Sequence, residues 1–397
     1  MDASSFQKHS RKNFSSEKYI ALLVGQYGSP SYPDRRVQEE SLRELHLLCD
    51  TAGVSQMIEI FVHVQHPDPA YFFTEGMRER FAQIIKEENI NLLVADVALK
   101  PNQLRNLEEE LKVRVIGRIE LILDIFAMRA KTRTAALQVE HAQLSYILPR
   151  LKGLGGVLSR LGGGIGTRGP GESMLETDRR HIRRRLQKIE EELRQLEKHR
   201  QNTRKNRNLL TFALAGYTNA GKTSLLNRLS NTPKPLLAED RLFATLDSFS
   251  RKVYLGDLDF RPLYCMVTDT VGFIRNLPAS LVAAFSSTLE ELSYSDVLIL
   301  VLDASSPQFE DELMVVKAEL ERLRIADKPQ IWFMNKSDLV FPSELKQLRK
   351  KYPHAVWGNT LSKEGVRELK QKMRQYAEEV YIPQKKAQSI SKKHLLY

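Results

Sequence analysis

The stretch GYTNAGKT, from Gly216 to Thr223, constrains the fold more than any other part of the chain. It matches the pattern G-x-x-x-x-G-K-[ST] at every fixed position. The apolar run 209–215 before it predicts a strand, and residues 224–230 after it predict a helix. Strand, glycine-rich loop and helix in this order are the context of a P-loop, where backbone N–H groups surround phosphates at a helix N-terminus. We therefore expect an α/β nucleotide-binding domain.

The P-loop predicts most of the contacts with phosphate. Lys222 would neutralise the β- and γ-phosphates, and the Thr223 hydroxyl would bind Mg²⁺. Asn219 has two open roles, which are to hold K⁺ beside the same phosphates or to stabilise the loop through its amide. The predicted nucleotide-binding residues of this loop are Gly216, Tyr217, Thr218, Asn219, Ala220, Gly221, Lys222, Thr223 and Ser224.

Two further motifs follow, each at the end of an expected strand. Asp269 would hold Mg²⁺, and the N–H of Gly272 would meet the γ-phosphate. Asn335, Lys336 and Asp338 form N-K-x-D, in which a carboxylate facing two ring N–H donors selects guanine over adenine. The spacings of 53 residues from Gly216 to Asp269 and 66 from there to Asn335 fit one domain. Together the three motifs predict a guanine nucleotide.

A mobile loop between these motifs must reach the γ-phosphate. Thr245 is the candidate for a second hydroxyl ligand of Mg²⁺, with Thr268 and Thr270 as alternatives. The predicted catalytic residues are Lys222, Thr245 and Gly272. Phe273 stands where Ras-like enzymes carry a glutamine that orients the attacking water. A phenylalanine cannot hydrogen-bond water, so we expect slow hydrolysis that a partner accelerates.

The chain upstream of the P-loop has a different organisation. Strand and helix patterns alternate over residues 19–117, which predicts a small parallel α/β domain. The expected domains are 1–118 (α/β), 119–207 (a helical arm with a glycine-rich basic loop), 208–376 (the P-loop domain) and 377–397 (a basic tail).

The arm is expected to be an antiparallel helical hairpin, coiled-coil in character. One helix is expected over residues 120–150. The second carries apolar residues at heptad spacing, namely Leu175, Ile182, Leu186, Ile189, Leu193 and Leu196. The tip between them contains G-x-G-x-x-G at 164–169, but no strand precedes it, so we do not interpret it as a dinucleotide site.

Positive charge is concentrated in the arm. The chain has a net charge of +11, and residues 152–208 hold 15 Lys or Arg against 7 Asp or Glu. Such a concentration predicts an anionic partner, first nucleic acid and second a membrane surface, whereas a flexible linker with a solvated basic helix is the alternative. The candidate RNA contacts are Arg160, Arg168, Arg179, Arg180, Arg183, Arg184 and Arg185.

Composition excludes several classes of protein. No apolar run reaches the length of a membrane-spanning helix, and the first residues lack the apolar core of a secretory signal. The chain has 2 cysteines, too few for a disulfide framework. We expect a cytoplasmic monomer without membrane insertion, with peripheral membrane contact as an alternative.

The residues around these motifs resemble the HflX family of translation-associated GTPases. The likeness is carried by segments 160–172, 175–185, 216–227 and 269–278, and it extends over about residues 19–375. It implies a cytoplasmic GTPase that binds the large ribosomal subunit through its rRNA and splits stalled or idle ribosomes. The family's fifth motif aligns best with Asn359, Thr360 and Leu361, which implies a guanine contact there. A signalling switch whose arm binds a protein effector, and a membrane-binding module timed by GTP, are the rival interpretations.

Overall fold

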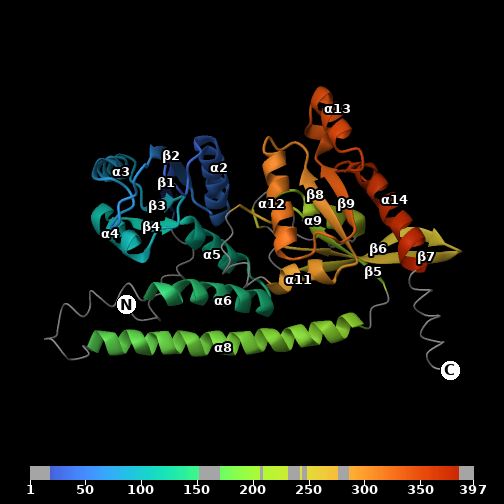
Figure 1. Cartoon of the computed structure of the whole chain (residues 1–397), viewed down its shortest axis with the longest axis horizontal. Helices are drawn as coiled ribbons and strands as arrows, with labels where there is room; N and C mark the ends of the chain where they lie inside the picture. Colours follow the sequence, from blue (N-terminus) through green and yellow to red (C-terminus); the bar gives the residue numbers. More distant parts are fainter. Residues whose placement is uncertain are drawn as a thin grey trace. The chain divides into compact units, whose positions relative to one another are not determined.

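The computed structural model describes residues 18–151, 170–205, 209–230, 242–243, 248–275 and 286–383. Side chains within 170–175 and 199–205, and those of 286–288, are outside this description. The chain forms two compact units, whose described parts end at Glu197 and begin at Lys198. Each unit is built around one sheet (Figure 1). The bounds of the four domains drawn from the sequence stay predictions.

The sheet of the first unit is wholly parallel. Its strands run in the order β2-β1-β3-β4, with β1 at Ile20–Tyr27, β2 at Gln56–His63, β3 at Leu92–Ala95 and β4 at Arg114–Gly117. The connecting helices are α2 (Arg35–Ala52), α3 (Glu75–Glu87) and α4 (Pro101–Leu111), and α5 (Arg118–Arg129) follows β4. Alternate residues of β1 face opposite sides, and helices cover both faces of the sheet (Figure 1). The predicted parallel α/β fold is confirmed.

A buried ionic cluster joins three elements of this unit. Arg118, the first residue of α5, donates from its guanidinium to Asp96 Oδ1 after β3 at 3.1 Å and to the Ser41 carbonyl of α2 at 3.2 Å. It also pairs with Glu44 of α2. The side chains of Arg118, Asp96 and Glu44 are all buried. The cluster therefore fixes how α2 and α5 sit against the ends of the strands.

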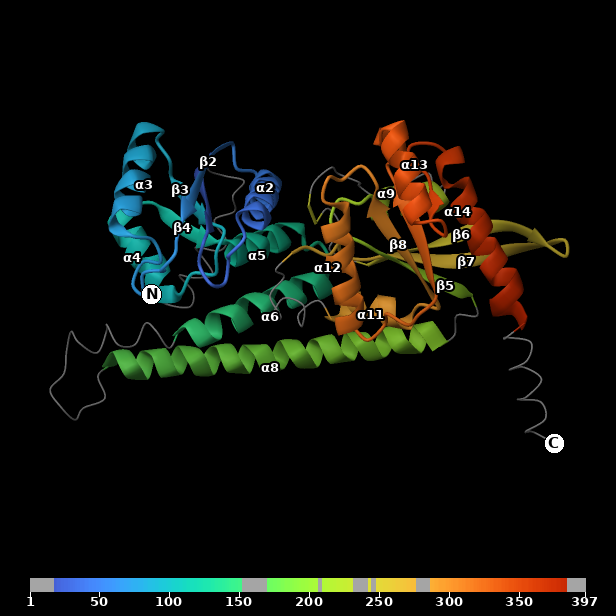
Figure 2. The same cartoon turned by 45° about the horizontal axis from the view of Figure 1, so that its top comes forward.

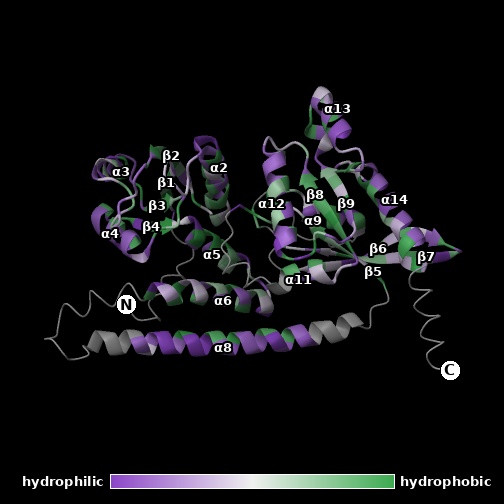
Figure 3. Cartoon of the chain, in the orientation of Figure 1, coloured by the Kyte–Doolittle hydropathy of each residue, from purple (hydrophilic) through white to green (hydrophobic). Residues whose placement is uncertain are grey.

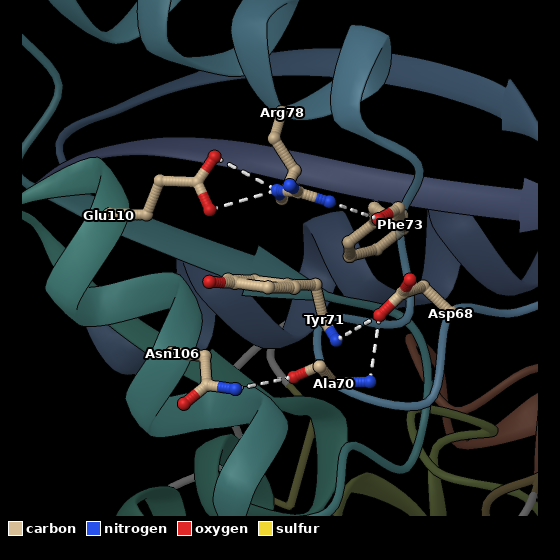
Figure 4. Close-up of polar contacts among 7 residues, drawn as sticks. All are labelled: Asp68, Ala70, Tyr71, Phe73, Arg78, Asn106 and Glu110. Carbon is tan, nitrogen blue, oxygen red and sulfur yellow. Dashed lines mark hydrogen bonds and ion pairs between the residues drawn. The ribbon is translucent and has the colours of Figure 1, made fainter.

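The loop between β2 and α3 is ordered by a second set of polar contacts (Figure 4). Asp68 Oδ1 accepts a hydrogen bond from the N–H of Tyr71 at 2.8 Å. Arg78 of α3 lies over the Tyr71 ring at 4.0 Å and donates from Nε to Glu110 of α4 at 2.9 Å. These contacts join α3, α4 and the loop, so we assign them a role in stability.

The single helix expected over residues 120–150 is instead two helices. Helix α5 ends at Arg129, and α6 spans Arg133–Arg150. Ala130 between them is extended, with ψ 96°, and the Thr132 hydroxyl accepts from the Ala135 N–H at 3.1 Å. An N-capping threonine satisfies an amide that a continuous helix would bond internally. The apolar pattern continued across this break and concealed it.

The predicted antiparallel helix pair is formed by α6 and α8, which spans Pro170–Lys205 (Figure 2). Leu137 and Leu144 of α6 pack with Ile182 and Ile189 of α8, and Leu186, Leu193 and Leu196 are partly buried against them. Two ion pairs join the helices in antiparallel register: Arg185 with Glu140 at 2.6 Å and Arg133 with Glu192 at 2.9 Å. Most of the coloured part of α8 is hydrophilic (Figure 3).

The sheet of the second unit has the strand order β10-β9-β8-β5-β7-β6, and only β6 runs antiparallel to its neighbour. The strands are β5 (Leu210–Ala215), β6 (Phe249–Leu258), β7 (Arg261–Asp269), β8 (Val297–Asp303), β9 (Gln330–Asn335) and β10 (Val356–Trp357). The helices are α9 (Lys222–Ser230), α11 (Ser286–Tyr294), α12 (Phe309–Arg322), α13 (Pro342–Lys351) and α14 (Arg367–Tyr376), with short turns η3 (Ser337–Leu339), η4 (Glu364–Val366) and η5 (Ala377–Tyr381). The core contains Phe212, Leu225, Val301 and Phe333.

Neither cysteine takes part in a disulfide. Cys49 and Cys265 are both buried, and burial raises the pKa of each thiol, that of Cys265 to about 12. Both therefore stay protonated at neutral pH. Among the residues that the structure describes, no helix is long and apolar enough to cross a bilayer.

Candidate nucleotide-binding site

Two positions of the P-loop require glycine, because neighbouring atoms leave no room for a Cβ. A Cβ on Gly216, directly after β5, would lie 2.1 Å from the Val301 carbonyl oxygen of β8. Gly221 has a φ of +93°, and a Cβ there would lie 2.2 Å from Asn335 Nδ2. A side chain at Gly216 would collide with backbone, and one at Gly221 would strain the dihedral angle and displace the Asn335 amide. The loop is therefore held against both the neighbouring strand and the N-K-x-D motif.

Lys222 begins α9 and is buried. Its Nζ donates to the carbonyl oxygens of Tyr217 at 2.7 Å and Gly216 at 3.2 Å. Burial lowers the pKa of this ammonium group to about 8, and the nearby Asp269 carboxylate opposes the shift. A buried cation inside a loop of backbone amides provides a strong site for an anion.

The two predicted magnesium ligands in the described chain are adjacent. The Thr223 hydroxyl donates to Asp269 Oδ2 at 2.7 Å, and Asp269 is completely buried at the end of β7. The alternative ligands are engaged elsewhere: the Thr270 hydroxyl donates to the Leu214 carbonyl at 2.7 Å, and that of Thr268 hydrogen-bonds Ser250. Thr245 lies outside the described residues.

The segment after β7 lies along the P-loop. The Thr218 N–H donates to the Phe273 carbonyl at 2.8 Å, and the Phe273 N–H donates to the Gly216 carbonyl at 3.1 Å. These bonds place Gly272 so close to the loop that a Cβ would lie 2.9 Å from Lys222 Nζ. The Phe273 ring is buried. The structure thus places Gly272 beside the lysine.

The N-K-x-D motif also contacts the P-loop, through its first residue. Asn335 Nδ2 donates to the Ala220 carbonyl at 2.8 Å, which ties β9 to the P-loop. Lys336 Nζ pairs with Asp303 Oδ2 at 2.6 Å. Asp338 follows in η3, which begins after Lys336 with a φ of +57°. Asp303 was missed by sequence analysis, although a carboxylate directly after the apolar run of β8 was the available indication.

The 359–361 segment lies beside this motif because β10 pairs with β9. Asn359 Oδ1 accepts from the Leu361 N–H at 3.1 Å, which forms a tight turn. Arg228 of α9 donates from its guanidinium to the Thr360 carbonyl at 2.9 Å and to that of Leu361 at 2.6 Å. Sequence analysis missed Arg228, because nothing in the pattern of α9 marks a contact with a segment over a hundred residues away.

Models of known families cover most of the chain. Residues 39–127 match the "GTP-binding GTPase N-terminal" family, 129–207 the "GTP-binding GTPase Middle Region", and 211–336 the "50S ribosome-binding GTPase" family. GTPase HflX of Caldanaerobacter subterraneus subsp. tengcongensis is 45% identical over 327 residues, which are 82% of this chain and 74% of that protein. This chain belongs to the HflX family of GTPases. The resemblance inferred from the motifs is confirmed.

Other relatives agree with this placement. GTPase HflX of Escherichia coli is 39% identical over 83% of this chain and 77% of its own length, and that of Treponema denticola is 39% identical over 85% and 88%. A crystal structure of SsGBP with GDP superposes with a TM-score of 0.50 at 25% identity, and covers 92% of this chain and 99% of that one. The chain is therefore a GTPase with a P-loop nucleotide-binding domain.

The arginines of this HflX-family arm differ in their surroundings. Arg185 makes two hydrogen bonds to the carboxylate of Glu140, both of 2.6 Å, so its guanidinium is committed to the helix pair. Arg179 is half-buried, whereas Arg180, Arg183 and Arg184 are exposed. Arg160 and Arg168 lie outside the described residues. The exposed three are the best-placed candidates for a partner.

Proposed function

We propose that this GTPase binds the large ribosomal subunit in its GTP state, splits idle or stalled ribosomes, and is released by hydrolysis. The proposal is carried by one observation: a nucleotide site of the GTPase type shares a chain with a packed helix pair whose exposed arginines follow the glycine-rich segment in the sequence. The domain match to a family described as ribosome-binding supports it. The protein would act as a cytoplasmic monomer.

Mg²⁺ is the metal that these residues would hold. A hydroxyl from Thr223 and a carboxylate from Asp269 are hard oxygen donors of the kind that magnesium prefers. We expect Thr245 to add a second hydroxyl when the nucleotide is GTP. Bound magnesium would supply charge neutralisation between the β- and γ-phosphates. Whether Asn219 holds K⁺ in addition stays a prediction.

Guanine recognition would use the two segments at the end of β9 and β10. The Asp338 carboxylate would accept from two N–H groups of the base, while Asn335 keeps the P-loop and the base site in register. Lys336 is fixed by Asp303, so its aliphatic stem would lie against the base. The turn Asn359–Leu361, held by Arg228, would place backbone N–H groups near the guanine O6.

Hydrolysis by the isolated protein should be slow. Lys222 and the Gly272 N–H would stabilise charge on the transferred phosphoryl group. The buried Phe273 offers no group to orient water. A partner that repositions the switch loops would therefore supply acceleration, and the ribosome is that partner in this proposal.

The arm is tested by removing charge in two matched places. Replacing Arg180, Arg183 and Arg184 by alanine should weaken binding to purified large subunits and reduce the dependence of affinity on salt, because three phosphate contacts are lost. The control replaces Lys188, Arg194 and Lys198, which are also exposed on α8, and removes the same charge. Co-sedimentation over a series of KCl concentrations measures both. Equal losses in the two variants would show a general charge effect and refute the assignment of the arm.

A further inference from the structure

The hairpin of β6 and β7 ends in an unusual turn. Leu258 pairs with Arg261, so Asp259 and Phe260 are its two loop residues. Both have positive φ, +50° for Asp259 and +61° for Phe260. This is the pattern of a type I′ turn, in which aspartate is favoured first and glycine second. The phenylalanine at the second position therefore strains the backbone by about 1 kcal/mol.

The exposure of the Phe260 side chain to water adds a second unfavourable contribution to the stability of the free protein. The side chain is fully exposed, the most exposed of the large apolar side chains in the described parts of the chain. A residue that strains the turn and also places an aromatic ring in water does not serve the stability of the free protein. Both costs are explained when the ring is buried against a partner.

The outer face of the same hairpin carries aromatic rings and cations, beside Asp257, whose side chain hydrogen-bonds Tyr254. Tyr254 and Tyr264 lie directly opposite each other on the two strands, with ring centroids 5.6 Å apart. Lys252 Nζ lies 3.9 Å from the centroid of the Tyr264 ring. Tyr254 is 45% exposed, and Lys252 is exposed as well. Arg261, also exposed, follows the tip directly.

We propose that this hairpin is a second RNA contact, in which Phe260 stacks on an unpaired base. Aromatic side chains on a sheet face stack on bases, and interleaved cations meet the phosphates between them. A pocket on a protein partner would instead favour a continuous apolar surface, which Lys252 and Arg261 interrupt. Asp259 does not argue against RNA, because the turn itself favours aspartate at that position. The inference rests on the proposed function only in taking RNA as the partner.

The turn makes the test unusually direct. Phe260→Gly removes the ring and supplies the residue that the turn prefers, so the melting temperature should stay the same or rise. The affinity of the full-length protein for a fluorescein-labelled single-stranded RNA of mixed sequence, about 12 nucleotides long, should fall about tenfold. Phe260→Trp should retain binding, because it keeps a stacking surface. Fluorescence anisotropy of the GDP-bound protein measures each affinity.

Two controls separate stacking from other effects. Phe341→Ala removes an aromatic side chain that is 75% exposed in the same unit, before α13, and should leave RNA affinity unchanged. The same strand annealed into a duplex has no unpaired base, so Phe260→Gly should not alter its binding. Unchanged single-strand affinity in Phe260→Gly, an equal loss in Phe341→Ala, or an equal loss with the duplex would each overturn the proposal. These outcomes do not depend on ribosome splitting, which the arm variants test separately.

Discussion

Replacing Lys222 by alanine is expected to lower GTP turnover by about 10²–10³-fold, the usual cost of removing one strong group that stabilises transition-state charge. The lysine is buried, and its ammonium group is bonded to the P-loop carbonyls of Gly216 and Tyr217. Single-turnover hydrolysis of radiolabelled GTP at saturating enzyme measures the effect. Lys328→Ala, which removes a half-buried lysine that contacts the Ser295 carbonyl elsewhere in the unit, should retain the parental rate.

The same lysine predicts a pH dependence of nucleotide binding. Its pKa is lowered to about 8 in the protein without nucleotide. Above that pH the lysine of the free site is neutral, and binding of phosphate must take up a proton, so GTP affinity should fall as pH rises through this value. In the unfolded chain the lysine keeps its proton up to its ordinary pKa of 10.5. Between pH 8 and 10.5 the unfolded state therefore binds more protons than the folded state, so the lysine's contribution to the free energy of unfolding rises with pH in this range. Titration calorimetry in two buffers measures proton uptake, and Lys222→Ala should abolish it. Equal uptake in parent and variant would assign the proton to another group.

Replacing Arg118 by methionine is expected to destabilise the first unit by about 3–5 kcal/mol, because Asp96 and Glu44 would remain buried without their cation. Arg35→Met is the control. Arg35 pairs with Glu39 on the surface of α2, where removal of the charge should leave the stability of the unit nearly unchanged. Hydrogen exchange of β1 and β3 amides reports the stability of this unit.

Tryptophan fluorescence reports the stability of the second unit separately in the Arg118→Met variant. Both tryptophans, Trp332 and Trp357, lie in the second unit. Urea unfolding followed by tryptophan fluorescence should therefore change little in Arg118→Met, and GTP turnover should be retained. Unchanged exchange rates in β1 and β3 would show that the cluster does not stabilise the sheet, and loss of turnover would contradict its purely structural role.

The sequence predicted the parts of the site that are local in the chain. The P-loop, Asp269 and Asn335 each lie at the end of an apolar strand, and parallel strands bring such ends to one edge of a sheet. Contacts between distant segments were not predictable in the same way. The pairing of Arg228 with the 359–361 turn depends on where β10 docks, which no short pattern encodes.

The sequence also did not predict two features of the backbone, a break between helices and a strained turn. The division between α5 and α6 follows from one capping threonine, Thr132, within an apolar pattern that continues on both sides. The strain at Phe260 depends on a positive φ, and a sequence of Asp followed by Phe does not by itself indicate a type I′ turn. Periodicity reports which face is buried, whereas breaks and strained turns depend on single dihedral angles.

Sedimentation with purified ribosomes in density gradients tests the central claim most directly. The full-length protein is mixed with intact ribosomes in the presence of GDP, GTP or a non-hydrolysable GTP analogue. We expect the protein to travel with the large subunit in the analogue-bound state, intact ribosomes to separate into subunits with GTP, and the GDP state to stay at the top of the gradient. Protein that stays at the top in every nucleotide state would contradict the account, and the arm would then have a protein effector or a membrane as its target.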